Sequence, residues 1–524
     1  MIIVSLLLFA AGSTDYYIKR DQLFSNIAYV IAGLILTAFI CVFIKIFSKH
    51  LNALLTKHQK TIIIATLLLF LALSIILCIS GFFYSDWDPL AILYAVYEIK
   101  HGNAEAAANA YFSNHPNNLM LVWLYLTVVK MTSVLKVNAV LVLIVFQCII
   151  SSIAAFIFWR IVDEGLAGSK VVPYAGLLIY EIWIGLSPWF IITYSDEIGI
   201  IFPLLILRIY QKITYSYNNG RSKSGLMWFV LMSFIAGTGY FIKPQIIISY
   251  IAAVLFFLFR KGSKRKFRIK ELVVYIGVCM ISVVISGAIV KGMLIPSLGM
   301  ELDNNRSFGM AHYFMMGLNG ETDGVYSDED TLFTDSFSSP EKKRNADMQK
   351  AAERIKGYGF VGLIEHAKKK TFVNYNDGLF AWGVDGKFFA GRESDELGNV
   401  KKMPLTDIVW SFIMPEGSDH GKYSSFLQII WLTVLLLDTI CAIVYGKRQF
   451  GRNRDIHRDG WYDRDEAYVV MLSLTGLFLF ELLFEAKARY LFIYTPYYLI
   501  LSVYGTYVVM SMISYKTGFY RGKE

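Results

Sequence analysis

The chain has 524 residues, of which 56% are hydrophobic and 15% aromatic, whereas only 17% are charged. Soluble proteins carry about 25% charged residues, and apolar runs of about 20 residues recur along this chain. These properties exclude a soluble globular protein and predict an integral membrane protein. The net charge of +9 does not indicate nucleic acid as a partner, because the basic residues cluster in short loops between apolar runs.

In chain order, the apolar runs predict an all-α polytopic membrane protein with about 11–13 transmembrane helices. The N-terminal run 2–11 is short, so it either crosses the membrane or is partly embedded in it. Residues 119–129 cover only about two-thirds of the length of a span, and we expect them to dip into the outer leaflet. The other predicted spans are 27–47, 61–83, 139–158, 172–193, 198–210, 226–241, 245–259, 271–290, 426–445, 467–484 and 490–512.

Clusters of Lys and Arg set the orientation, because such loops stay in the cytoplasm. The basic segments are 49–60, 160–170, 211–223, 260–270, 446–465 and the tail after residue 515. The extracytoplasmic face then carries the segments 84–118, 193–197, 243–245, 296–423 and 485–489.

The chain accordingly divides into three parts. Residues 1–293 form an N-terminal transmembrane module with a first outer loop at 84–118, residues 294–423 an extracytoplasmic loop region, and residues 424–524 the C-terminal transmembrane helices and a cytoplasmic tail. Within the loop region, Ser339 followed by Pro340 is a helix-start signal. The alternating charges and apolar face that follow predict a helix on the membrane surface.

Several motifs of known chemistry are absent from the sequence. It contains no G-x-x-x-x-G-K-[ST], no H-E-x-x-H and no G-x-S-x-G. The string GYGFVG at 357–362 follows a basic helical stretch instead of a strand, so we do not interpret it as a dinucleotide fingerprint. The five cysteines all lie in apolar runs and offer no disulfide framework.

Two pairs of acids stand beside predicted spans on the extracytoplasmic side. Asp86 and Asp88 follow one span in the string FFYSDWDPLAI, and Asp196 with Glu197 precedes another. Acids this close to the hydrocarbon are unfavourable unless they face a cavity, a partner or a site. Helix capping is the simpler explanation for a single D-x-D, but two acidic pairs on one side favour a site.

Cations accompany the acids on the same side, namely Lys243, Lys487 and Arg489. Because Lys and Arg are disfavoured in short outward loops, we expect an anionic partner for them. It is either an internal acid such as Glu481 or Glu485, or a lipid phosphate, which Arg binds well through its forked donors. A carboxylate base beside phosphate-binding cations suits glycosyl transfer from a lipid-phosphate sugar, although a proton-coupled transporter also uses buried acids.

Five further segments, together with the acids, resemble a known superfamily. They are NHPNN at 114–118, IKPQ at 242–245, HYFMMGLNGETDGVYSDED at 312–330, NYNDGLFAWGVDGKFF at 374–389 and FEAKARYLFIYTP at 484–496. In this order they resemble the GT-C superfamily of polyprenyl-phosphate-sugar-dependent glycosyltransferases, in a Gram-positive bacterial branch similar to the protein O-mannosyltransferases and the aminoarabinose transferase. The resemblance covers roughly residues 60–510.

The resemblance implies a GT-C fold and an inverting transfer on the extracytoplasmic face of the cell membrane. The donor would be a sugar on a polyprenyl (undecaprenyl) phosphate, and the acceptor a cell-surface glycan or cell-wall polymer. The first-loop acid would be the catalytic base, which leaves Asp86 and Asp88 as candidates, with Asp86 slightly favoured because it is closer to the span.

The same resemblance assigns roles to the remaining candidates. Asp196 or Glu197 would assist by holding the acceptor or, in metal-using members, a divalent cation, and Lys243, Lys487 and Arg489 would bind the lipid phosphate. His115 either binds the acceptor or only shapes the first loop. No metal ligand set and no cofactor is predicted. The aromatic residues Trp382, Phe388 and Phe389 are candidates for stacking on sugar rings or for a membrane-interface belt.

Two alternatives from other classes stay open. A lipid-linked saccharide flippase or exporter would place acids and cations deep inside the spans, along a path across the bilayer. A glycan polymerase or ligase would take a lipid-diphosphate donor and would also use outward cations and a large outer loop.

Overall fold

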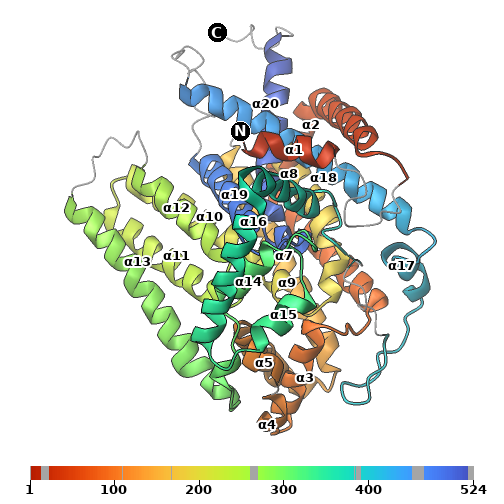
Figure 1. Cartoon of the computed structure of the whole chain (residues 1–524). Coiled ribbons are helices and arrows are strands. Elements are labelled where there is room, and N and C mark those ends of the chain that lie inside the picture. The colour runs from red at the N-terminus through yellow and green to blue at the C-terminus, as the bar shows by residue number, and fades with distance from the viewer. Residues whose placement is uncertain are drawn as a thin grey trace.

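The architecture is all-α, as predicted (Figure 1). The computed structural model describes residues 2–12, 23–108, 110–166, 168–259, 269–382, 384, 391–450 and 465–516. Within these ranges the only β pairing is an isolated bridge between Tyr84 and Gly391. The helices are α1 (Ile2–Gly12), α2 (Asn26–Gly81), α3 (Asp88–Lys100), α4 (Ala104–Ala107), α5 (Ala110–Asn114), α6 (Leu119–Met131), α7 (Ala139–Gly165), α8 (Val171–Tyr180), α9 (Ser195–Gly199), α10 (Ile201–Asn218), α11 (Ser222–Tyr240), α12 (Ile246–Phe259), α13 (Ile269–Ile289), α14 (Met310–Gly317), α15 (Asp328–Asp335), α16 (Pro340–Tyr375), α17 (Thr406–Ile413), α18 (His420–Phe450), α19 (Asp465–Leu483) and α20 (Thr495–Lys516).

Six helical stretches of the described chain are long and apolar enough to cross a membrane, which confirms a polytopic membrane protein. They are Asn26–Gly81, Ala139–Gly165, Ser195–Asn218, Val273–Leu298, His420–Gly446 and Asp465–Leu483. Six is fewer than the predicted 11–13 spans, because Asn26–Gly81 contains two of them and several other predicted segments form shorter helices. The helix α6 has 13 residues, so it extends about 20 Å and is too short for a hydrocarbon core of about 30 Å.

Three of the predicted spans differ in detail from the helices observed. Residues 27–47 and 61–83 both lie within α2, a stretch of 56 residues that consists of two helices joined across a kink at His58 (φ −120°, ψ 22°). The predicted span 172–193 is broken, since α8 ends at Tyr180 and a π-helical turn follows at Glu181–Gly185. A second short turn begins at Pro188, whose missing N–H prevents a regular helix from continuing.

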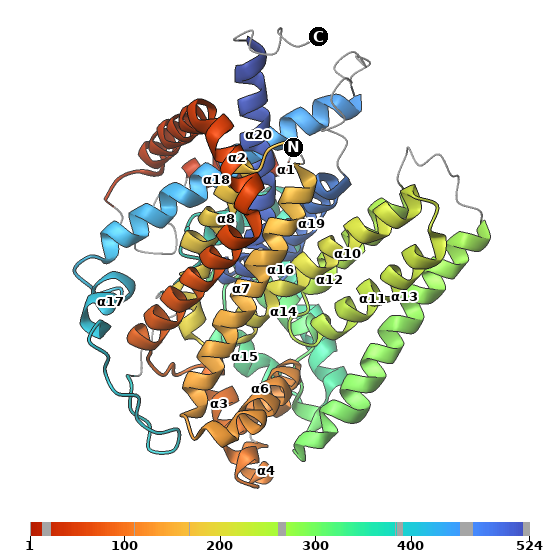
Figure 2. The same ribbon diagram turned by 180° about the vertical axis from the view of Figure 1, so that it is seen from behind.

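Figures 1 and 2 show how the elements are arranged. The helices α3, α4 and α5 lie together at the lower end of both views, whereas α1 lies in the upper part. The long helix α16 begins at the predicted N-cap, where the Ser339 hydroxyl accepts from the Lys342 amide at 3.3 Å. It kinks at Gly359 (φ 59°), which explains the GYGFVG string as a helix bend. Its last turns are buried against the bundle, so the predicted surface helix runs into the protein at this end.

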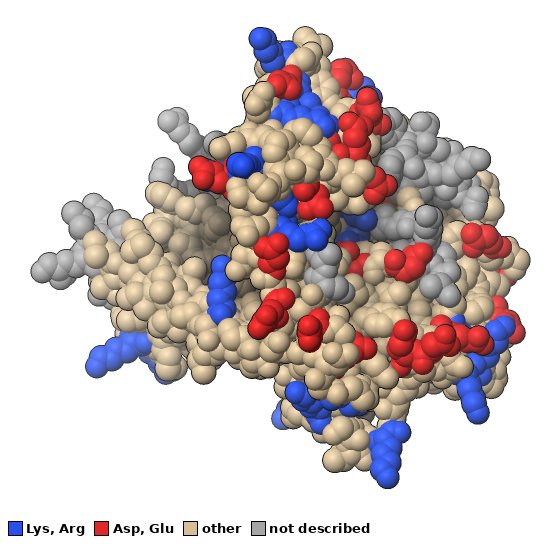
Figure 3. Space-filling model, turned by 60° about the horizontal axis from the view of Figure 1, so that its bottom comes forward, with Lys and Arg blue, Asp and Glu red and all other residues tan. Residues whose placement is uncertain are grey.

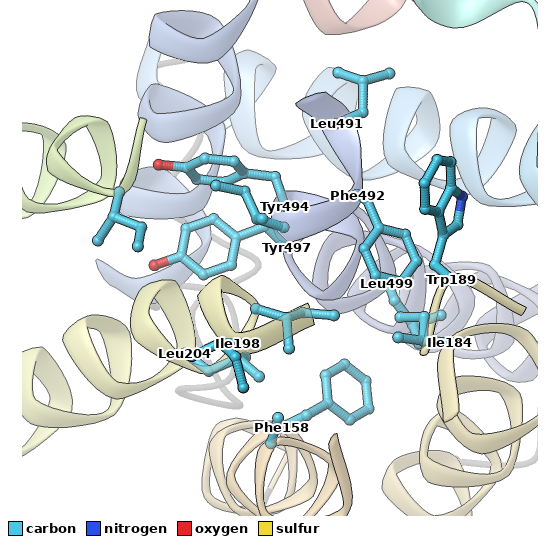
Figure 4. Packing of buried hydrophobic residues seen from close by; sticks show 14 of the residues in the cluster. Phe158, Ile184, Trp189, Ile198, Leu204, Leu491, Phe492, Tyr494, Tyr497 and Leu499 are labelled. Carbon is cyan, nitrogen blue, oxygen red and sulfur yellow. The ribbon is translucent and has the colours of Figure 1, made fainter. Parts of the chain in front are cut away.

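The core of the bundle is rich in aromatic residues around α20 and the 3₁₀ segment Ala488–Tyr494 that precedes it (Figure 4). Tyr494 and Tyr497 are fully buried, and their hydroxyls donate to the carbonyls of Gln245 at 2.8 Å and Pro203 at 2.7 Å. A buried hydroxyl needs such a partner. These bonds fix the start of α20 against α10 and against the segment that carries Lys243.

Candidate functional site

The first acidic pair lies on the turn between α2 and α3. The α2 helix ends at Gly81, residues 82–85 are buried, and Asp86 is exposed. Trp87 is the N-cap of α3 and Asp88 its first residue, followed by Pro89, but no side chain caps the helix. Capping therefore does not explain either acid. Asp88 does lie in the first turn of α3, at the positive end of the helix dipole.

The surroundings of the two acids differ. The hydroxyl of Tyr194 donates to Asp88 Oδ2 at 2.7 Å, whereas Asp86 has no hydrogen-bond partner among the described residues. Tyr111 lies next to Asp88 as well, and burial together with this carboxylate raises the pKa of the Tyr111 hydroxyl well above its usual value. Asp88 is thus held in place by its neighbours, and Asp86 is open to an incoming molecule.

Both acids border a cavity of about 370 Å³. The cavity is lined by Asp86, Trp87, Asp88, Leu90, Ala91, Tyr94 and Tyr111. Its walls therefore come from the acidic turn, from one face of α3 and from α5, and they combine carboxylates with aromatic rings. Such a mixture is typical of sites that orient a polar ligand against a few apolar surfaces.

The second acidic pair is fully buried and contacts two of the predicted cations. Asp196 forms an ion pair with Lys243, and its Oδ2 atom lies 3.5 Å from Arg489 Nε. Asp196, Lys243 and Arg489 are 0%, 5% and 3% exposed. Both carboxylate oxygens of Glu197 lack a hydrogen-bond partner in the described part of the chain. Asp196 is thus an internal acid that pairs with both cations.

Aromatic rings join this ion cluster to the acidic turn. The Arg489 guanidinium lies 4.1 Å from the ring centre of Trp87 and 5.1 Å from that of Tyr194. The ammonium of Lys487 lies 5.7 Å from the Trp87 ring and that of Lys243 5.8 Å from the Tyr194 ring. The ring centres of Trp87 and Tyr194 lie 5.1 Å apart. The structure thus brings the predicted acids and cations around one pair of aromatic side chains.

His115 is near the site but does not line the cavity. Its Nδ1 atom lies 3.4 Å from the Tyr313 hydroxyl, and its ring packs against Tyr111 at 5.0 Å and Phe308 at 5.3 Å. Burial lowers the pKa of the His115 imidazole, which the Asp88 carboxylate opposes. His115 therefore supports the wall that holds Tyr111 and Asp88.

The aromatic residues that the sequence suggested for sugar stacking do not line the cavity in the described part of the chain. Trp382 is buried in the core, where its Nε1 donates to the Ile413 carbonyl at 2.7 Å, so it is available neither to a sugar nor to the membrane. Phe388 and Phe389 lie outside the described residues. Among the residues that the structure describes, no group of three His, Cys, Asp or Glu side chains is placed to hold a metal ion.

Sequence reasoning missed the aromatic part of the site. Trp87 stands between the two acids and Tyr194 two residues before Asp196, so adjacency to the acids was the available signal. The ring centre of Trp189 lies 5.7 Å from the Arg489 guanidinium. No sequence signal pointed to Trp189, because a tryptophan in an apolar run is usually a core residue.

Together these residues offer general-base, anion-binding and stacking chemistry at one place. Asp86 presents open carboxylate oxygens, and the cations beside Trp87 provide positive charge for an anion. Acidic and basic side chains are also interspersed over the lower face of the molecule, the end at which α3, α4 and α5 lie (Figures 1 and 3).

Comparisons with known proteins identify a family without a stated activity. A family model described as a conserved hypothetical integral membrane protein matches residues 1–508. No curated protein and no solved structure matches the chain. Because the match covers nearly the whole sequence, the chain belongs to this family of conserved hypothetical integral membrane proteins.

Proposed function

We propose that this protein is a membrane glycosyltransferase of the GT-C type. It would transfer a sugar, with inversion, from a polyprenyl (undecaprenyl) phosphate to an extracytoplasmic cell-surface glycan or cell-wall polymer. The observation that carries the proposal is the contact between Trp87 and Arg489 at 4.1 Å. This contact joins a cavity bordered by two carboxylates to a buried group of cations.

In the proposed reaction Asp86 is the general base. Its carboxylate accepts the proton of the acceptor hydroxyl while that oxygen attacks the anomeric carbon of the donor sugar. The bond between the anomeric carbon and the phosphate oxygen breaks, and the polyprenyl phosphate leaves with the electron pair. The open oxygens of Asp86 support this role, whereas the Tyr194 hydrogen bond to Asp88 supports an orienting role for Asp88.

The leaving phosphate would bind at the cations beside Trp87. Arg489 offers forked donors that suit phosphate oxygens, and Lys487 contacts the same ring. Lys243 is already paired with Asp196, so its contribution would be to hold Asp196 and Tyr194 in place and to add positive potential. The donor is chemically activated by its phosphate bond, and the proposal therefore requires no nucleotide.

The proposal is tested with purified protein and a panel of donors and acceptors. The donors are polyprenyl-phosphate sugars and, in parallel, polyprenyl-diphosphate oligosaccharides, and the acceptors are isolated cell-wall glycans. Transfer from a monophosphate donor, with release of polyprenyl phosphate, supports the proposal. Transfer only from the diphosphate donors would replace it with a polymerase or ligase.

One observation favours a second candidate, an exporter or flippase of lipid-linked saccharides that is coupled to protons. Glu197, Asp438 and Glu481 are fully buried, and none of their carboxylate oxygens has a hydrogen-bond partner in the described residues. Buried carboxylates within helices are typical of proton relays. Movement of a fluorescent lipid-linked saccharide across proteoliposomes in response to a pH gradient, without glycosyl transfer, would favour this candidate.

A further inference from the structure

The C-terminus of α2, which leads directly into the acidic turn, is closed by a single buried arginine. Arg392 is 7% exposed, and its guanidinium donates to the carbonyls of Ser80 at 2.9 Å, Phe82 at 2.8 Å and Ile79 at 3.1 Å. Its other donors bind the carbonyls of Val400 at 3.0 Å and Lys401 at 2.8 Å. All five N–H groups of the side chain are therefore engaged by main-chain carbonyls.

These bonds complete the end of the helix. The last carbonyls of an α-helix have no partner within the helix. Here Arg392 takes those of residues 79, 80 and 82, and the Trp410 indole N–H donates to the Gly81 carbonyl at 3.0 Å. The Tyr84 amide then donates to the Gly391 carbonyl at 2.5 Å. The segment around Arg392 thus fixes the chain up to two residues before Asp86.

A buried lysine has the same role at the end of α19, which leads directly into the loop of Lys487 and Arg489. Lys370 is fully buried, and its ammonium donates to the carbonyls of Leu482 at 2.9 Å, Phe484 at 2.5 Å and Gly317 at 2.9 Å. The acceptors belong to the ends of α19 and α14. A cation at a helix C-terminus is favoured by the helix dipole, and here one cation serves two helices.

Two glycines let this arrangement close tightly. A Cβ at Gly317 would lie 2.5 Å from the Phe484 carbonyl oxygen, and one at Gly324 would lie 2.8 Å from the Gly317 oxygen and 3.0 Å from Lys370 Cε. The Ala486 amide donates to the Gly324 carbonyl at 2.7 Å. The chain is therefore held on both sides of Glu485, immediately before Lys487 and Arg489.

We infer that Arg392 and Lys370 are positioning residues, through which the region 294–423 holds the two loops of the site independently. Arg392 sets the turn that carries Asp86 and Asp88, and Lys370 sets the loop that carries Lys487 and Arg489. That these loops perform the chemistry rests on the proposed function. The positioning of the loops can be measured without an activity assay. The positioning inference and the proposed function can therefore be refuted independently of each other.

Hydrogen exchange of the full-length protein, followed by mass spectrometry, tests the positioning. Peptides that cover 82–88 and 484–490 report on the two loops through the amides of Tyr84 and Ala486. We expect Arg392→Gln to speed exchange at least about tenfold in the first peptide only, and Lys370→Met to do so in the second only. The controls are Arg344→Gln and Lys368→Met, which remove exposed cations of α16 and should change neither peptide.

Two results would overturn the inference: unchanged exchange in both peptides, or equal acceleration of both peptides in either variant. If Arg392→Gln does not fold, Arg392→Lys retains the charge and three donors and should give an intermediate acceleration of the first peptide. Where transfer activity is established, the kinetics should separate as well. Arg392→Lys should lower kcat, and Lys370→Met should raise KM for the lipid donor about tenfold or more, whereas a general loss of structure would change both constants in both variants.

Discussion

Replacing Asp196 by Asn should destabilise the protein strongly, and a second substitution should restore part of the loss. Asp196 and its ion-pair partner Lys243 are 0% and 5% exposed. Removing one member of a buried ion pair costs about 3–5 kcal/mol, because the other charge remains buried. In Asp196→Asn the Lys243 ammonium and the Arg489 guanidinium both lose this carboxylate, and we expect a loss of at least that size.

The double variant Asp196→Asn, Lys243→Met removes both charges of the pair. Arg489 keeps its contacts with Trp87, Trp189 and Tyr194, each worth about 0.5–2 kcal/mol when desolvated. We therefore expect the double variant to be about 1–3 kcal/mol more stable than Asp196→Asn alone. This partial recovery of stability is expected because the charges of Asp196 and Lys243 are coupled.

Thermal and denaturant unfolding of the detergent-solubilised protein measures these differences. The exposed pair Lys402–Asp407, with an N–O distance of 3.0 Å, is the matched control, and Asp407→Asn should cost no more than about 1 kcal/mol. If the effects of Asp196→Asn and Lys243→Met simply add in the double variant, the buried charges are not coupled and the reasoning is refuted.

Three further predictions concern the site and its supports. Trp87→Ala removes the ring that contacts Arg489 and Lys487 and should raise KM for the lipid donor about tenfold, with a smaller rise in Trp87→Phe; an unchanged KM would contradict the stacking role. Burial lowers the pKa of the Lys370 ammonium to about 7 against the opposing effect of Glu481 and Glu485, while burial keeps the pKa of the neighbouring His366 below its usual value. Above that pH the neutral Lys370 amine has only two N–H groups for three carbonyls. The KM for the lipid donor should therefore rise from about pH 6 to about pH 8 in the wild type and stay constant in Lys370→Met. Parallel pH profiles of the two proteins would exclude Lys370 as the titrating group. Gly324→Ala adds a Cβ at a φ of +81° and 2.8 Å from the Gly317 oxygen, which should lower stability by about 1–3 kcal/mol. Gly102→Ala, at a φ of +84° with open space around it, isolates the conformational part in the same melting experiment, and an equal loss in both variants would show that the close packing contributes nothing.

The acidic turn could be predicted from the sequence because local signals mark it. The apolar run before Gly81 and the proline after Asp88 fix where one helix ends and the next begins. The length of α2 could not be predicted in the same way. Its charged stretch 49–60 has the composition of a cytoplasmic loop, but Lys, Gln and Leu are also good helix formers, and the stretch is helical except for the kink at His58.

The supports of the site have no comparable signal in the sequence. Lys368, Lys369 and Lys370 are consecutive, and only the helical rotation of α16 makes the third one buried while the first two are exposed. Arg392 stands in a polar segment where a solvated side chain is the default expectation. Three of its five partners are main-chain carbonyls of residues about 310 positions earlier, and carbonyls leave no pattern in a sequence.

The pairing of Asp196 with Lys243 and Arg489 could be predicted from the sequence only in part. The residue types were predictable, since cations beside a membrane span need an anion. The choice of Asp196 as their partner depends on tertiary packing, because α9 lies against the 3₁₀ segment Ala488–Tyr494.

The central claim is that an acid of the first outer turn takes the proton in a transfer from a polyprenyl-phosphate sugar. Its most direct test is the rate of polyprenyl phosphate release by the purified wild type, Asp86→Asn, Asp88→Asn and the double variant, with folding checked by thermal melting. We predict that Asp86→Asn lowers the rate by about 10²–10⁴-fold, while Asp88→Asn has a smaller effect. Full activity in both single variants and in the double variant would contradict the claim.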